Sequence, residues 1–184
     1  MPYPAKLTPE TIFKAALELF ERGGPDALAM RPLADALGVR PSSLYRYYPE
    51  RAALLRALEA HATSALHDAL RRAAHDKAPD AAFFAAAHSY LDYVRAHPHL
   101  YALLLGPRAP YTAEPGPGKN LWDEVLAIVG AITGDPDDTA ATVAFWAYLH
   151  GFALLELSGQ FGSSGPKGGF ERGLEAMLNG FGKA

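Results

Sequence analysis

The sequence predicts an all-α protein, and three observations carry this prediction. Alanine is abundant while runs of Val, Ile and Thr are scarce, which favours helices over sheets. Apolar residues recur three and four positions apart along most of the chain, as they do on one face of a helix. Proline, glycine and short polar side chains stand at the ends of these segments, where helices begin and end.

We expect a small three-helix domain over residues 1–51 and a larger helical domain over residues 52–184, with about nine helices in all. Residues 106–119 and 159–169 are expected to be loops because Gly and Pro are concentrated there. The expected helices, in chain order, cover residues 9–22, 31–37, 41–48, 50–77, 80–97, 99–105, 120–133, 136–159 and 167–181.

The first expected helix has a clear signal at each end. Thr8, Pro9 and Glu10 match an N-cap, a first-turn proline and an acid beside the positive end of the helix dipole. The glycines at positions 23 and 24 end the segment. The residues of its apolar stripe are Ile12, Ala16, Leu19 and Phe20.

A very short turn joins the next two expected helices. Gly38 suits the position just after a helix end, where a left-handed backbone is easiest for glycine, and Pro41 opens the following helix. A turn of three or four residues swings one helix across the other, which is the spacing of a helix-turn-helix. We expect Val39, Leu44 and Tyr48 to pack inward on the first helix.

The outer face of the third helix is left with Ser42, Ser43, Arg46 and Tyr47. Arg can bond guanine bidentately, Ser can bond several base edges and Tyr can reach phosphates, while a helix N-terminus favours an anion near Arg40. Whether Arg46 and Tyr47 contact bases or phosphates stays open at this point. The alternative is a half-buried, tyrosine-rich helix whose hydroxyls only reach water.

Two further arginines flank this segment. Arg31 opens the second expected helix and Arg51 opens the fourth, so both would neutralise phosphates beside the groove. The fourth helix would be on the order of 40 Å long at 1.5 Å per residue, long enough to join two modules. Its apolar stripe is Leu54, Leu55, Leu58, Ala62, Leu66 and Leu70.

Two later helices carry strong start signals. The run from Asp135 to Asp138 contains Pro136 and three acids, and Asn120 is followed by Asp123 three residues on. Acids in a first turn complement the helix dipole, and a short polar side chain caps the free N–H groups.

Residues 8–58 resemble the N-terminal domain of TetR-family transcriptional regulators over essentially the whole length of that domain. The matching motifs are "AALELFERGG", "LADALGV" and "SSLYRYYPERAALL", in this order and spacing. The third helix is the recognition helix in that family. The resemblance therefore implies a DNA-facing role for Arg31, Arg40, Pro41, Ser42, Ser43, Tyr45, Tyr47 and Arg51, and core positions for Leu44 and Tyr48.

This chain departs from the family pattern at two positions. Ala29 stands where Ser or Thr often caps the second helix, and the lost side-chain cap would cost about 1 kcal/mol. Tyr48 stands where Phe is frequent before the terminal proline.

Residues 145–161, "FWAYLHGFALLELSGQF", form a segment that is apolar nearly all round. A helix of this kind is buried on both sides, against its own domain and against either a ligand cavity or another subunit. Trp146, His150 and Gly151 resemble the Trp-x-x-x-His-Gly signature of the WHG subgroup of TetR regulators, and Gly151 would permit close approach of helices.

In the TetR family the last two long helices of each copy form a four-helix bundle across a two-fold axis. The resemblance therefore implies a homodimer. The dimerisation residues that it implies here are Phe145, Leu149, Phe152, Phe170, Leu174, Met177, Leu178 and Phe181. A stripe that serves only the protein's own core is the alternative for the last five.

Aromatic and histidine side chains with polar tips also collect in the second domain and suit a pocket for a mostly apolar small molecule. The expected effector-binding residues are Phe84, His88, Tyr93, Tyr101, Trp146 and His150. His97 and His99 are two residues apart with a proline between them, which is poor spacing for metal ligands on one helix face. We expect no metal and no cofactor.

Composition restricts the remaining possibilities. The chain has 184 residues, a net charge of −3 and no cysteine, so no disulfide framework or thiolate chemistry is available, as is usual in the cytoplasm. We expect no membrane span, because no stretch approaches 18 uncharged apolar residues, and the N-terminus lacks the apolar region of a signal peptide.

The sequence thus predicts a cytoplasmic, DNA-binding transcriptional regulator rather than an enzyme. It would act as a homodimeric repressor that binds a near-palindromic operator and is released by an effector. The alternatives are a helical interaction protein and a small-molecule enzyme using His88 or His150 as a base. The sequence does not decide between repressor and activator.

Overall fold

The computed structural model describes residues 7–106 and 116–182, and all the regular secondary structure in these ranges is helical. This confirms the predicted fold class. The chain divides into two compact units, residues 1–62 with 97–111 and residues 63–96 with 112–184. These units follow spatial contacts, and the expected domain boundary at residue 51 stays a prediction.

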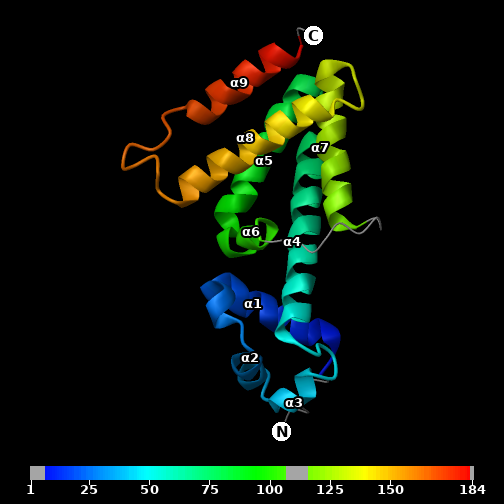
Figure 1. Cartoon of the computed structure of the whole chain (residues 1–184), viewed down its shortest axis with the longest axis vertical. Helices are drawn as coiled ribbons and strands as arrows, with labels where there is room; N and C mark the ends of the chain where they lie inside the picture. The colour runs from blue at the N-terminus through cyan, green and yellow to red at the C-terminus, as the bar shows by residue number, and fades with distance from the viewer. Residues whose placement is uncertain (1–6, 107–115, 183–184) are drawn as a thin grey trace. The chain divides into compact units, whose positions relative to one another are not determined.

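The described residues form nine helices (Figure 1). In chain order they are α1 (Pro9–Ala27), α2 (Met30–Ala36), α3 (Pro41–Leu44), α4 (Arg51–Ala74), α5 (Pro79–Ala96), α6 (Pro98–Leu104), α7 (Pro117–Thr133), α8 (Thr139–Leu157) and α9 (Gly169–Phe181).

Most helix ends lie within three residues of the expected positions, and the two largest differences are at the ends of α1 and α3. The helix α3 is a single turn, shorter than expected. The helix α7 begins at Pro117 with Gly116 as its N-cap, so Asn120 lies inside the helix and not at its start. Residues 107–115 of the expected loop lie outside the described residues.

The helix α1 also runs past the expected stop, with a kink. Gly24 has φ 66°, a left-handed conformation, and Pro25 follows it within the helix. Glycine is the residue that adopts this backbone at little cost. A side chain at this position would also collide with the ring of His99 from α6. The glycine pair therefore bends the helix here and does not end it.

The first unit has a core contributed by α1, α2, α3 and the first half of α4. Its fully buried side chains are Ile12, Ala16, Phe20, Leu28, Leu33, Ala34, Leu44, Leu54 and Leu58. The helix α6 packs on α1, where Nδ1 of His97 lies 2.7 Å from a carboxylate oxygen of Glu21. The predicted N-cap of α1 is confirmed, because the hydroxyl of Thr8 accepts a hydrogen bond from the backbone N–H of Thr11 at 3.2 Å.

The second unit is built from the second half of α4 with α5, α7, α8 and α9 (Figure 1). Phe83 of α5 stacks on Phe145 of α8 at 4.3 Å between ring centroids. Arg95 of α5 donates two hydrogen bonds, of 2.7 and 2.9 Å, to the carboxylate of Glu156 on α8. These bonds raise the pKa of the Arg95 guanidinium above its usual value. Apolar stacking and a bidentate ion pair thus hold α5 to α8.

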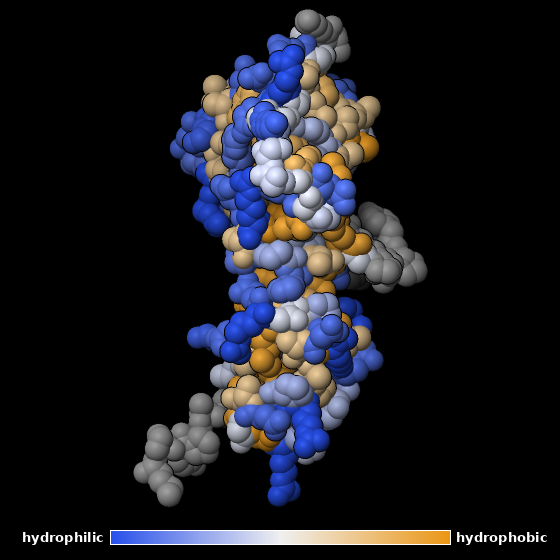
Figure 2. All heavy atoms as spheres, turned by 90° about the vertical axis from the view of Figure 1, so that its left-hand side faces the viewer, coloured by the Kyte–Doolittle hydropathy of each residue, from blue (hydrophilic) through white to orange (hydrophobic). Residues whose placement is uncertain are grey.

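The helix α8 is the one helix of the described residues that is long and apolar enough to cross a membrane by length and composition. This corrects the expectation that no such stretch exists, although a core helix of a globular protein passes the same test. One side of α8 packs in the second unit through Phe145, Leu149 and Phe152. The other side is exposed, and Figure 2 shows apolar surface near the connection between α8 and α9.

Candidate nucleic-acid interface

The geometry of the segment from Gly38 to Tyr48 is set by backbone hydrogen bonds. Gly38 has φ 64°, and the N–H of the following Val39 donates to the carbonyl of Ala34 at 3.0 Å, which closes the end of α2. Pro41 then occupies the first turn of α3. Past this single helical turn, the N–H groups of Tyr47 and Tyr48 both donate to the carbonyl of Leu44 at 2.9 Å.

The buried side of this segment is the one expected from the sequence. Leu44 is fully buried, while Val39 and Tyr48 are half-buried. Burial, and secondarily the charge of Glu10, raise the pKa of the Tyr48 hydroxyl. Tyr48 is thus half-buried, in the place where the TetR pattern often has phenylalanine.

The opposite side of the segment is exposed. Tyr45 is 48% exposed and Tyr47 is 37% exposed, and Ser43 is half-buried. The other exposed members of the predicted DNA-facing set are Arg31, Arg40, Pro41, Ser42, Arg46 and Arg51.

Three of the four predicted arginines keep their charge available. Arg31, Arg40 and Arg46 form no ion pair or side-chain hydrogen bond with any other residue that the structure describes. The helix α2 has no side-chain cap at Ala29, as expected, so its first N–H groups are also unsatisfied by a side chain. Exposed cations and free N–H groups are the donors that phosphate oxygens accept.

Tyr47 and Arg51 differ from the other predicted contacts, because their polar groups bond to the protein. The hydroxyl of Tyr47 donates to the carbonyl of Leu7 at 2.9 Å. The guanidinium of Arg51 donates from Nε to the carbonyl of Leu28 at 2.6 Å and from Nη2 to the carbonyl of Pro25 at 2.5 Å. These bonds could not be predicted from the sequence, since the partners are 40, 23 and 26 residues away.

Two of the predicted effector-binding residues, Trp146 and His150, lie where α8 packs on α5. Trp146 and His150, one helical turn apart on α8, lie edge to face at 4.6 Å. Nδ1 of His150 is 2.8 Å from the hydroxyl of Tyr90 on α5, and the ring of Tyr90 also contacts Trp146. His88 is exposed. The Trp-x-x-x-His pair thus forms part of the packing between α5 and α8.

The remaining predicted effector residues differ in exposure, and their role stays a prediction. Phe84 is half-buried and Tyr93 is 9% exposed, while Tyr101 is fully buried and belongs to the first unit. None of the six lines the three cavities described in the second unit.

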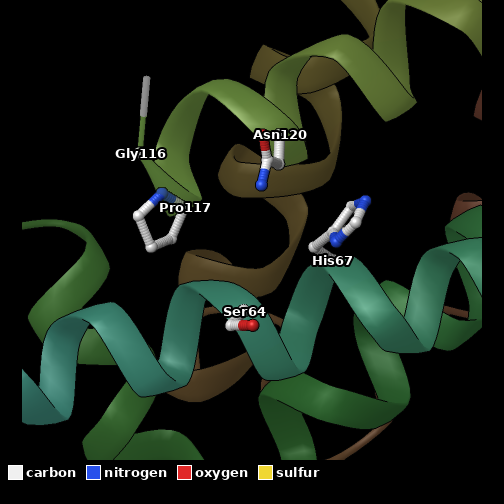
Figure 3. A pocket seen from close by; sticks show the side chains of 5 residues that line it. All are labelled: Ser64, His67, Gly116, Pro117 and Asn120. Carbon is white, nitrogen blue, oxygen red and sulfur yellow. The ribbon is translucent and has the colours of Figure 1, made fainter. Parts of the chain in front are cut away.

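Two of these cavities differ in the polarity of the residues that line them. Between α4 and α7 lies a cavity of about 180 Å³ with a polar lining (Figure 3), formed by Ser64, His67, Gly116, Pro117 and Asn120. Beside α8 and the connection to α9 lies a groove of about 410 Å³. Its lining is mostly apolar and includes Ala147, Gly151, Leu155 and Phe161.

Five of the eight expected dimerisation residues are buried within a single copy of the chain, and their role in a dimer stays a prediction. A side chain that is buried within one copy has little accessible surface left for contact with a second copy. The buried five, at most 7% exposed, are Phe145, Leu149, Phe152, Phe170 and Leu174. Met177, Leu178 and Phe181 are half-buried.

The side of α8 that stays exposed carries a different set of residues. Val143 and Leu154 are 52% and 44% exposed, and between them Ala147 and Gly151 continue the same face at helical spacing. Leu155 and Leu157, 46% and 43% exposed, border this face. The small residues Ala147 and Gly151, four apart in the sequence, indicate this face. The sequence alone does not distinguish it from the buried face of α8, because both faces are apolar.

Comparison with known proteins gives two family matches. Residues 12–58 match the family described as bacterial regulatory proteins, tetR family. Residues 83–180 match the family described as tetracyclin repressor-like, C-terminal domain. The membership in the WHG subgroup expected from Trp146, His150 and Gly151 stays a prediction.

Individual relatives agree with these matches. An uncharacterized HTH-type transcriptional regulator of Mycobacterium tuberculosis is 32% identical over 162 residues, which cover 85% of this chain and 73% of the relative. The class A tetracycline repressor from transposon 1721 of Escherichia coli is 45% identical over 53 residues, 29% of this chain and 24% of that protein.

Solved structures share the fold along nearly the whole chain. A protein of unknown function from Rhodococcus sp. RHA1 superposes with a TM-score of 0.82 at 24% identity, over 98% of each chain. A TetR variant from Acinetobacter baumannii in complex with minocycline superposes with a TM-score of 0.69 at 25% identity, over 96% of this chain and 97% of that one.

Proposed function

Since this chain belongs to the TetR family and is a DNA-binding transcriptional regulator rather than an enzyme, we propose that it is a cytoplasmic repressor. In this proposal a homodimer binds a near-palindromic operator, and a small-molecule effector releases the DNA. Each copy places its recognition segment, residues 40–48 around α3, in one half-site. Two copies of one chain related by a two-fold axis match a DNA site of the same symmetry.

The exposed face of residues 40–46 is the observation that carries this proposal. Arg40 and Arg46 have no partner among the described residues, and Tyr45 is 48% exposed. An interior segment would satisfy these groups within the protein, whereas a major groove offers them base edges and phosphates. The proposed DNA contacts are Arg31, Arg40, Pro41, Ser42, Ser43, Tyr45 and Arg46.

The exposed face of α8 supports the homodimer. A contiguous apolar face exposed to water is typical of a surface that another molecule covers. Ala147 and Gly151 are small and would let a second α8 approach closely, while Val143 and Leu154 would fill the space beside them. We propose this face, in place of the buried Phe145, Leu149 and Phe152, as the α8 contribution to the dimer.

The effector part of the proposal rests on the minocycline complex of the Acinetobacter baumannii relative and on the second unit's expected role. The polar cavity between α4 and α7, about 180 Å³, is smaller than the roughly 300–1,000 Å³ that drug-sized ligands need. An effector releases DNA only if it binds the non-binding conformation more tightly, because equal affinity for both conformations shifts nothing.

A duplex-binding assay tests the DNA-binding part of the proposal. The wild type is titrated onto the duplex upstream of its own gene and onto a random duplex, each over a range of salt concentrations. We expect specific binding with a steep salt dependence. Replacing Arg46 by Ala removes two cations per dimer and lowers the magnitude of the salt slope by about 1.8, if each contacts one phosphate.

The matched control is Arg72→Ala, which removes an equally exposed arginine from the end of α4 and should leave both the affinity and the slope unchanged. A wild type that binds no duplex at any salt concentration would overturn the proposal and favour a helical protein-interaction module.

A further inference from the structure

Two residues that the TetR resemblance places on the DNA are hydrogen-bonded to the two ends of α1. We propose that Tyr47 and Arg51 are positioning residues, which fix the orientation of the recognition segment against α1, and not DNA contacts. This inference rests on the proposed DNA-binding function. It assigns the two residues a role that differs from the one implied by the resemblance.

Arg51 holds the end of α1. Two of its five N–H donors bond to the carbonyls of Pro25 and Leu28 at 2.5 and 2.6 Å. The last carbonyls of a helix have no partner within the helix, and a cation there is favoured by the negative end of the helix dipole. Since Arg51 is also the first residue of α4, its side chain ties the start of α4 to the end of α1.

Tyr47 holds the start of α1. Its hydroxyl donates to the carbonyl of Leu7 at 2.9 Å, and Leu7 directly precedes the N-cap Thr8. The reciprocal bonds between Thr8 and Thr11 fix the first turn of this helix. A hydroxyl has one proton to donate, so in this geometry the Tyr47 hydroxyl is not available to donate to a phosphate.

The two bonds act on the same short connection. Residues 47–51 join α3 to α4, and this connection is tied at one end to the first residues of α1 and at the other to its last residues. The helix α1 is 19 residues long and is kinked at Gly24, so the two attachments lie at opposite ends of a helix that is at most about 28 Å long at 1.5 Å per residue. Two widely separated attachments resist rotation of the recognition segment better than either one alone.

A residue that contacts phosphate and a residue that positions the recognition segment affect DNA binding differently. A phosphate contact strengthens binding to every duplex and adds to the salt slope. A positioning residue leaves the number of phosphate contacts unchanged but lowers the preference for the operator over a random duplex, because base contacts depend on the angle at which the segment enters the groove.

The test uses the full-length chain with the substitutions Tyr47→Phe and Arg51→Lys. The first removes only the hydroxyl, and the second keeps the positive charge but loses the planar pair of donors. Tyr148→Phe is the matched control for the first, because it also removes a hydroxyl that donates to backbone carbonyls, those of Gly169 and Phe170 at 3.0 and 2.9 Å, but in the second unit. The affinities for the operator duplex and for a random duplex are measured over a range of salt concentrations, at a temperature well below the unfolding temperature of each variant.

We expect each positioning variant to bind the operator about fivefold to tenfold more weakly, the loss of one hydrogen bond of average strength. The affinity for the random duplex and both salt slopes should stay at wild-type values. Faster hydrogen exchange at the backbone N–H groups near Leu28 in Arg51→Lys, and near Thr8 in Tyr47→Phe, should accompany the loss.

Three results would overturn the inference, and they are distinguishable. Equal losses of affinity for the operator and the random duplex, in Tyr47→Phe but not in Tyr148→Phe, would show that the Tyr47 hydroxyl contacts the DNA backbone directly. A lower unfolding temperature with an unchanged operator preference would show that the bonds only stabilise the fold. If the wild type bound no duplex, the proposed DNA-binding function would be wrong, and the positioning role would be wrong with it.

Discussion

Replacing Leu154 by Asp tests the exposed face of α8 as a dimer contact. Leu154 is 44% exposed and lies at one end of the face that it forms with Val143, Ala147 and Gly151. Because the side chain is exposed in one copy, the substitution leaves the core of the protomer intact. We therefore expect wild-type helicity but a weaker dimer.

The size of the effect follows from the exposed area. Full burial of a leucine is worth about 1.5–3 kcal/mol, so covering the exposed 44% of Leu154 is worth about 1 kcal/mol per copy. Both copies contribute in a symmetric contact, which gives about 2 kcal/mol. The dissociation constant of the dimer should then rise at least roughly 30-fold, and the cost of covering a carboxylate adds to this.

Sedimentation equilibrium over a wide range of protein concentrations measures this dissociation constant. The matched control is Leu105→Asp, the same change at a leucine that is 41% exposed at the end of α6. An unchanged dissociation constant in Leu154→Asp, or a rise of the same size in both variants, would refute the assignment of this face.

Three further substitutions test the packing. Phe145→Ala, which empties a fully buried site stacked on Phe83, should lower the free energy of unfolding by about 3–5 kcal/mol in denaturant titrations. A loss that depended on protein concentration would instead return Phe145 to the dimer contact. Thr8→Ala removes the cap of α1 and should cost about 1 kcal/mol of thermal stability, and a fully stable variant would show that the capping bonds are not formed in solution. Burial, and secondarily Glu171, raise the folded-state pKa of Tyr148 above its usual value, so its contribution to stability is complete below about pH 10 and is lost as the pH rises further. Tyr148→Phe should therefore lose less stability than the wild type between pH 9 and 11 in urea titrations, and equal losses would contradict the pKa direction.

The exposed side of residues 40–48, which we propose as the DNA-binding side, could be predicted from the sequence because its determinants are local. Gly38 and Pro41 fix the turn and the start of α3 by their own backbone preferences. Leu44 and Tyr48, four residues apart, then select the buried side, and Arg40, Tyr45 and Arg46 are left on the outside. The positions of Tyr47 and Arg51 could not be predicted in this way, since their partners belong to α1 and the residues beside it.

The two sides of α8 show the same limit. Its sequence is apolar nearly all round, so periodicity does not distinguish the side that packs in the protomer from the side left for a second copy. The aromatic residues were assigned to the dimer from the sequence, whereas packing against Phe83 and α9 uses them for the core.

The sequence by itself determined that this chain is all-α, where most of its helices begin and end, and which face of the recognition segment points outward. These properties depend on residues a few positions apart, whose backbone preferences and spacing act within one turn of helix. Only the tertiary structure decided which apolar face of α8 is free and which polar side chains, Tyr47 and Arg51, are bonded within the protein. These outcomes depend on contacts between segments distant in the chain, and the energy of such contacts is set by packing that no single segment contains.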